Sequence, residues 1–271
     1  MNMNNSFSWK YRPLFYSFVL FMGLILFTLA IQSEQPQFYP YIIVVLSFVF
    51  ILEIFSTIYF GNKILQQYSI PAIEIRDKFS NTIQHFVLPF SLFISIVMFI
   101  YFHNYVVIKW IILLCAFFLF WILFTNLRAF YEDKFKIEIK THYIYDIISI
   151  ISFFGLYDSV LNICNYWGQN LIITLLLLVF LILIYLGIIL IRLYNYKLFK
   201  LILPYIVVNI GLFLLFNSLG VSSIKIAFIS TLMYSFYIAY AHSHNENLKT
   251  YRIFEEYFVI LCISIILLVF N

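Results

Sequence analysis

Apolar residues run along the chain in nine long windows that are separated by connections richer in polar residues. About 20 predominantly apolar residues are enough to span the hydrocarbon core of a bilayer as an α-helix, and a helix satisfies its own backbone hydrogen bonds there. The windows lack the alternation of polar and apolar residues that membrane β-strands show. The pattern therefore predicts an all-α fold: a polytopic transmembrane helix bundle in which residues 1–271 form a single integral membrane domain. The predicted spans are about 13–31, 41–60, 86–102, 105–125, 143–163, 170–191, 199–217, 223–241 and 253–270.

Composition strengthens this prediction. Hydrophobic residues make up 64% of the chain and charged residues 10%, against roughly 25% charged residues in an ordinary soluble domain. No soluble fold of this length can bury that much apolar surface. The composition therefore excludes a water-soluble enzyme, a nucleic-acid-binding module and a disordered chain. Membrane lipids and other membrane proteins are the expected partners, and nucleic acid is not.

The basic residues predict the orientation of the chain in the membrane. Apart from Lys109 and Lys225, all of the 16 Lys and Arg residues lie in the N-terminal tail or at every second connection between the windows. Cytoplasmic loops carry an excess of Lys and Arg. We therefore expect the N-terminus in the cytoplasm, the C-terminus outside, and a multi-pass location in a bacterial inner membrane.

Two polar residues inside the windows are candidates for binding a solute or an ion. Ionisable residues within a membrane are costly and are functional candidates by default. Glu53 lies inside the second window, nearer its cytoplasmic end, where burial favours the protonated form of a carboxyl group. Asn209 lies inside the seventh window and is the suggested partner of Glu53. The alternative is structural: a protonated Glu53 hydrogen-bonded to a neighbouring helix.

A second acidic residue lies near the opposite face. Asp158 occupies the outer part of the fifth window, and Lys109 and Lys225 are the basic residues at the same level. An ion pair between helices is the expected role there.

A group of His and carboxylate residues lies at the predicted cytoplasmic edge. His142 and Asp146 are four residues apart and share one helix face. Imidazole and carboxylate groups are suitable ligands for divalent metals, although the spacing matches no diagnostic motif, and solvated helix ends have the same composition. The catalytic candidates are His142, Asp146, His242 and Glu256, and the metal-ligand candidates are His85, His142, His242 and His244. No cofactor is predicted.

Small residues recur at every fourth position through the eighth window. Such spacing lets another helix backbone approach closely, so we expect a helix-packing face, with a solute-lining face as the alternative. The residues are Ser223, Ala227, Thr231, Ser235, Ala239 and Ser243.

Part of the chain resembles an uncharacterised family. Residues 248–257 form a basic turn that leads through Glu255 and Glu256 into the last apolar window, and residues 227–234 lie in the window before it. From about His85 onward the chain is similar to an uncharacterised family of multi-spanning membrane proteins found in bacteria with reduced genomes. The resemblance implies no activity and no site residue.

Three functions remain open on the sequence alone. The leading prediction is a non-catalytic accessory or assembly component of the membrane. The second is a transporter of a small solute or lipid that uses Glu53 and Asn209. The third is a membrane enzyme that uses the His and carboxylate residues of the cytoplasmic edge.

Overall fold

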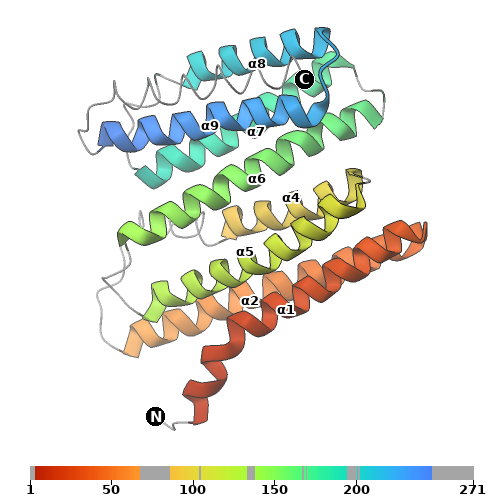
Figure 1. The fold of residues 1–271 in the computed structure, drawn as a ribbon. Helices are drawn as coiled ribbons and strands as arrows, with labels where there is room; N and C mark the ends of the chain where they lie inside the picture. Colours follow the sequence, from red (N-terminus) through yellow and green to blue (C-terminus); the bar gives the residue numbers. More distant parts are fainter. Residues whose placement is uncertain are drawn as a thin grey trace. The chain divides into compact units, whose positions relative to one another are not determined.

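The computed structural model describes the chain over residues 4–67, 86–103, 105–132, 138–166, 168, 170–193, 200 and 202–245. Side chains are described for residues 11–57, 86–103, 105–128, 144–166, 168, 170–190, 200 and 202–242. Within these ranges the regular structure is helical and contains no strand (Figure 1). The predicted all-α fold is therefore confirmed for the part of the chain that the structure describes.

Eight α-helices and one short 3₁₀ turn are described, and each of the first eight predicted windows lies on one of the α-helices. The ninth window, 253–270, lies outside the described residues, so the count of nine spans remains a prediction. The elements in order are α1 (Asn4–Gln32), η1 (Pro36–Phe38), α2 (Tyr39–Gln67), α4 (Leu88–Phe102), α5 (Val106–Glu132), α6 (Glu138–Tyr166), α7 (Leu171–Leu193), α8 (Ile202–Ser218) and α9 (Ser223–Asn245).

Six of the described helices contain segments long and apolar enough to cross a membrane, and we call these segments the candidate spans. They are Tyr11–Gln32, Pro36–Thr57, Val106–Arg128, Ile144–Tyr166, Leu171–Leu190 and Ser223–His242. The helices α4 and α8 are also apolar but shorter, with 15 and 17 residues.

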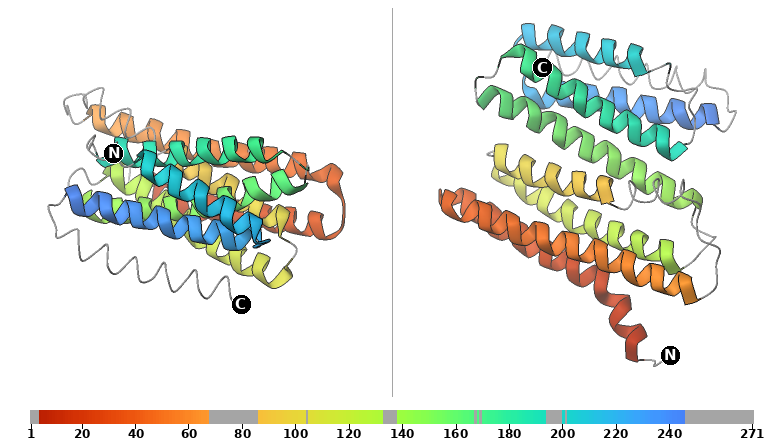
Figure 2. Two further views of the ribbon diagram at one scale, coloured as in Figure 1. Left: turned by 90° about the horizontal axis from the view of Figure 1, so that it is seen from above. Right: turned by 180° about the vertical axis from the view of Figure 1, so that it is seen from behind.

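The chain divides into two compact units, residues 1–148 and 149–271, and the division falls within α6. In the first unit, α1, α2 and α5 lie side by side (Figure 2), and α4 packs on α5 and α1. In the second unit, α9 packs against α7 and α8.

Phenylalanine rings form the centre of the first unit. Phe50 of α2 is fully buried and stacks on Phe93 of α4, with 5.1 Å between the ring centroids. The rings of Phe120 and Phe124 of α5 lie 5.9 Å and 5.7 Å from the same ring. Aromatic pairs at these distances are favourable beyond the area they bury, so Phe50 joins α2 to both neighbouring helices.

Gly23 allows α1 and α2 to approach closely. A Cβ atom at this position would overlap Cδ2 of Leu46, a residue of α2 that is 3% exposed. Leu46 therefore packs into the space that a side chain at position 23 would occupy.

The N-terminal part of α1 bends away from the rest of the helix (Figure 1). Pro13 lies within this helix, and proline removes a backbone hydrogen bond and kinks a helix. The carbonyl oxygen of Pro13 itself accepts a 2.7 Å hydrogen bond from the hydroxyl of Ser17, one turn further along the helix. Arg12, directly before this proline, reaches Glu53 of the neighbouring helix α2.

Tyrosine and phenylalanine rings form the centre of the second unit. Phe153 of α6 stacks on Tyr234 of α9 at 4.5 Å, and Tyr185 of α7 meets both rings edge-on at 5.3 Å and 5.7 Å. Tyr205 of α8 lies 5.5 Å from Tyr237 of α9. The second unit therefore carries hydroxyl groups in its interior, unlike the purely apolar centre around Phe50.

The end of α8 shows how the chain reverses between apolar helices. Gly220 has a φ of 69°, and the amide of Val221 donates to the carbonyl of Phe216 at 3.0 Å. This is the Schellman arrangement, in which a residue in the left-handed conformation ends a helix. It allows α9 to begin at Ser223, three residues after Gly220.

Candidate functional site

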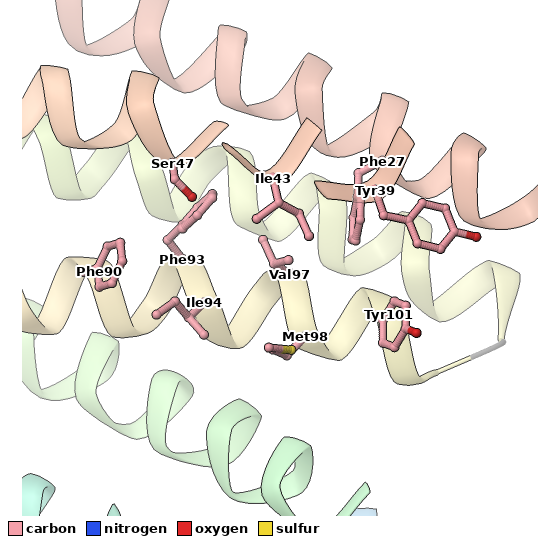
Figure 3. A pocket seen from close by; sticks show the side chains of 10 residues that line it. All are labelled: Phe27, Tyr39, Ile43, Ser47, Phe90, Phe93, Ile94, Val97, Met98 and Tyr101. Carbon is pink, nitrogen blue, oxygen red and sulfur yellow. The ribbon is translucent and has the colours of Figure 1, made fainter. Parts of the chain in front are cut away.

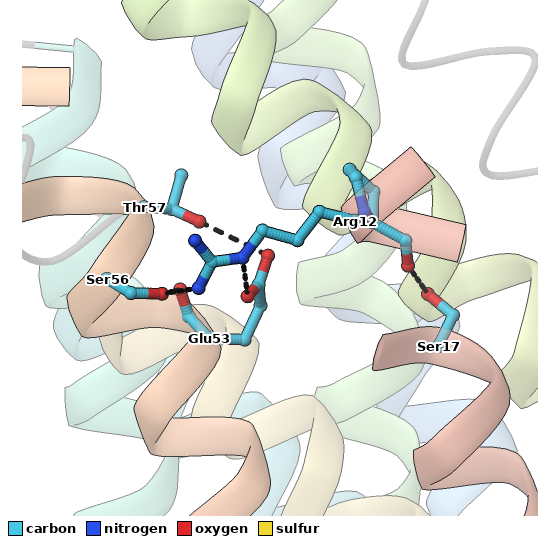
Figure 4. A network of polar contacts seen from close by, with 6 residues as sticks. Arg12, Ser17, Glu53, Ser56 and Thr57 are labelled. Atoms are coloured by element: carbon cyan, nitrogen blue, oxygen red, sulfur yellow. Dashed lines mark hydrogen bonds and ion pairs between the residues drawn. The ribbon is translucent and has the colours of Figure 1, made fainter. Parts of the chain in front are cut away.

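The buried carboxylate of Glu53 pairs with Arg12 between α2 and α1 (Figure 4). The Nε of Arg12 donates to Oε2 of Glu53 at 2.9 Å, and its Nη2 donates to the hydroxyl of Ser56. The hydroxyl of Thr57 donates to the second carboxylate oxygen at 3.3 Å. Glu53 is 2% exposed and Arg12 is 19% exposed. Both carboxylate oxygens therefore accept hydrogen bonds, and a cation compensates the buried charge.

This pair lies inside two candidate spans, near the end that the basic residues predict to be cytoplasmic. The guanidinium of Arg12 also lies over the ring of Tyr16, with 5.2 Å from Cζ to the ring centroid, a cation–π geometry. Charged residues within membranes usually pair with one another. The arrangement fastens the kinked start of α1 to α2.

Asn209 lies at the centre of a second polar cluster, in the second unit. Its side chain is fully buried. The hydroxyl of Tyr157 donates to Oδ1 of Asn209 at 3.2 Å, and Nδ2 of Asn209 donates to the hydroxyl of Tyr205 at 3.3 Å. Tyr157 belongs to α6, whereas Tyr205 and Asn209 belong to α8. The amide therefore bonds α6 to α8 with both of its functional groups engaged.

Further polar contacts link α6 to α9 in the same unit. The hydroxyls of Ser149 and Tyr234 form a buried hydrogen bond. Asn162 donates from Nδ2 to Oδ2 of Asp158 at 3.0 Å, and its Oδ1 accepts from the hydroxyl of Ser223 at 3.1 Å. The fully buried Asp158 is thus connected through Asn162 to the first turn of α9.

The pairing expected for Asp158 remains a prediction. Lys109 is 2% exposed and belongs to the first unit, whereas Asp158 and the half-buried Lys225 belong to the second. Glu53 and Asn209 also belong to different units, so the expectation that they share one cavity remains a prediction as well.

Most of the proposed His and carboxylate edge lies outside the described residues. This applies to His85 and Glu256 and to the side chains of His142 and His244. Asp146 is 7% exposed and His242 is half-buried. Among the side chains that the structure describes, no three His, Cys, Asp or Glu residues are grouped to hold a metal. The metal and catalytic predictions therefore remain predictions.

The small residues of α9 do not share one environment. Ala227 and Thr231 are buried, Ser223, Ser235 and Ala239 are half-buried, and the side chain of Ser243 lies outside the described residues. A spacing of four residues advances slightly more than one helical turn of 3.6 residues. The stripe therefore rotates around the helix, and its buried part lies at Ala227 and Thr231.

Sequence reasoning missed several residues that form these clusters. Arg12 was counted only as a basic residue of the N-terminal tail, although it directly precedes the long apolar run, where a charge is close enough to reach into the bundle. The sequence does not distinguish Tyr157, Tyr205 and Tyr234 from the other tyrosines, because 22 tyrosines are spread along the chain. A buried tyrosine hydroxyl becomes visible only when its partner on another helix is known.

Comparison with known proteins adds no relative: no protein-family model, curated protein or solved structure matches the chain. The resemblance to an uncharacterised multi-spanning family remains a prediction, and the function has to be argued from the polar clusters themselves.

Proposed function

We propose that the protein is a multi-pass protein of a bacterial inner membrane that performs no catalysis of its own and serves as an accessory or assembly component. This proposal is supported by the bonding of the polar side chains within the candidate spans: their partners belong to the same unit of the protein. Glu53 is bonded to Arg12, and Asn209 is bonded to two tyrosines. The Arg12–Glu53 pair joins α1 to α2 and the Tyr157–Asn209 bond joins α6 to α8, whereas the Asn209–Tyr205 bond lies within α8.

A solute-binding group has to exchange its partners when the solute arrives. The two groups expected to bind a solute are already engaged inside their own units, one by a cation and the other by two hydroxyls. Polar side chains commonly hold membrane helices together by such bonds. This supports a structural role for both residues over solute transport.

The experiment is a flux measurement on the purified protein in sealed vesicles, with a pH gradient and then a membrane potential imposed. We expect proton and ion leak rates equal to those of empty vesicles. A flux that is present in the wild type and lost in both Glu53→Gln and Asn209→Leu would overturn the proposal in favour of the transporter. In parallel, native gels of gently solubilised membranes should show the chain in a complex larger than the purified protein.

Lipid handling is a second candidate, because the first unit carries an apolar groove that opens between its helices.

The enzyme hypothesis depends on the His and carboxylate edge. Bound metal can be measured in the purified wild type and in a His142→Ala, His242→Ala double variant. The accessory proposal predicts no stoichiometric metal in either protein. A metal present in the wild type and lost in the double variant would replace the accessory proposal by the enzyme.

A further inference from the structure

A groove of about 440 Å³ lies between α2 and α4 in the first unit, with α1 at one end (Figure 3). Its walls are almost entirely apolar: Ile43 of α2 faces Phe93, Val97 and Met98 of α4, and Phe27 of α1 lines it as well. Phe93 and Val97 are buried, whereas Ile43 and Met98 are half-buried. The groove is therefore open along one side and closed along the other.

The polar groups of this groove lie mainly at one end. The hydroxyls of Tyr39 and Tyr101 gather at the end away from Phe90 (Figure 3). Their rings meet edge-on at 6.2 Å. At the other end the rings of Phe50 and Phe90 lie 6.5 Å apart. Two aromatic contacts thus bound an apolar channel, and only one of them carries hydroxyl groups.

The length of the groove matches one leaflet of a bilayer. Phe90 and Tyr101 are 11 residues apart on α4, which corresponds to about 16 Å at a helix rise of about 1.5 Å per residue. The hydrocarbon core is about 30 Å thick, so half of it is about 15 Å. Tyrosine is enriched at the membrane–water interface, which places the Tyr39 and Tyr101 end at the headgroups.

We propose that this groove binds one acyl chain of a phospholipid, with the headgroup beside the hydroxyls of Tyr39 and Tyr101. An apolar channel one leaflet deep, with two tyrosine hydroxyls at its interfacial end and the hydroxyl of Ser47 as the other polar side-chain group of its lining, is complementary to an amphiphile that enters from that leaflet. The distribution of basic residues predicts this to be the outer leaflet. The inference goes beyond the accessory role, which does not require a bound lipid.

The fit at the groove distinguishes a bound lipid from the general lipid surround. Apolar burial alone gives little preference inside a membrane, because lipid tails are as apolar as the groove. Retention of one chain therefore depends on the shape of the groove and on hydrogen bonds to the two tyrosines. Filling the groove should displace the lipid, whereas the same substitution on the lipid-facing side of α2 should not.

The test uses phosphatidylglycerol that carries a photoreactive diazirine at mid-chain, in nanodiscs containing the full-length protein. Ile43→Trp fills the groove, and Val44→Trp, at a neighbouring residue that is 66% exposed, is the matched control. We expect wild-type adducts on groove residues such as Met98, their loss in Ile43→Trp, and their retention in Val44→Trp. Equal unfolding temperatures show that both variants are folded, and Met98→Trp is the substitute if Ile43→Trp does not fold.

Two outcomes would overturn the proposal. Adducts spread along the exposed face of α2, at Val44 and Phe48 as strongly as in the groove, would mean general lipid contact only. A cross-link between two copies of the chain at groove residues, with no lipid adduct there, would assign the groove to self-association. Neither outcome bears on the flux measurement, so failure here is distinguishable from failure of the accessory proposal.

Discussion

Arg12 and Glu53 show how single residues decide whether a charge can remain inside a membrane helix. Glu53 is almost fully buried, whereas Arg12 keeps 19% of its side-chain surface exposed. Arginine can extend along apolar surface and keep its charged head near the interface. The two partners therefore differ in how much they depend on each other.

Arg12→Gln should destabilise the fold more than Glu53→Gln. Removing the cation leaves a buried carboxylate uncompensated, which costs about 3–5 kcal/mol for a buried pair. Removing the carboxylate leaves an arginine that can reach the interface, so the loss should be smaller. The free energy of unfolding in mixed detergent micelles measures both variants. The double variant should lose less than the sum of the single variants, because the two residues interact directly. Additive losses would show that the pair is not coupled.

Tyr157→Phe tests the second cluster with the removal of one oxygen atom. The variant loses the bond to Asn209, and interhelical hydrogen bonds in membrane proteins contribute about 0.6 kcal/mol on average and at most about 1.7 kcal/mol. We expect a decrease in unfolding free energy within that range. Tyr166→Phe, at a residue that is 78% exposed, is the matched control and should leave stability unchanged. Equal effects from both variants would argue against a role for the buried hydroxyl.

At the scale of helices, the positions of apolar windows were predictable and the helix ends were not. Each of the first eight windows lies on a described helix, because a spanning segment has to be both apolar and helical. However, α2 continues to Gln67 and α6 begins at Glu138, beyond the windows 41–60 and 143–163. Those extensions mix polar and apolar residues, so hydropathy alone does not mark them as helical.

Contacts between helices were less predictable than the helices. The spacing of small residues predicted a close helix contact on α9, whereas in the first unit the packing of α1 against α2 depends on one glycine of α1. No small residue lies four positions before or after Gly23 in the sequence. The sequence therefore shows it only as a single glycine within an apolar run. Its importance follows only from the position of Leu46 on the facing helix.

Gly23→Ala should therefore destabilise the chain. The added methyl group would overlap Leu46, and overpacking a well-packed site costs about 1–3 kcal/mol. Gly187→Ala is the control within α7, where a Cβ atom would meet nothing within 4 Å. It should be neutral or stabilising by up to about 1 kcal/mol, because alanine is a better helix former than glycine. Thermal unfolding in detergent compares the two. A neutral Gly23→Ala would contradict the close packing of α1 on α2.

At the scale of the whole molecule, the composition predicted the class of protein, and the structure confirms an apolar helical protein with six candidate spans among its described residues. The division into two units within α6 was not predictable, since it falls inside one continuous apolar window, 143–163. The function could not be predicted from the composition either. The polar residues inside the windows are too few to form a motif, and the role of each depends on which helix supplies its partner.

In the predicted topology the chain crosses the membrane an odd number of times, with its basic connections in the cytoplasm. The most direct test is labelling of single cysteines placed at Asn5 and at Asn271, in a chain whose native Cys115, Cys164 and Cys262 are replaced by alanine. With a membrane-impermeant maleimide on intact spheroplasts, we expect label at Asn271→Cys, and at Asn5→Cys only after permeabilisation. Labelling of both termini from the same side would require an even number of spans and would contradict the predicted topology.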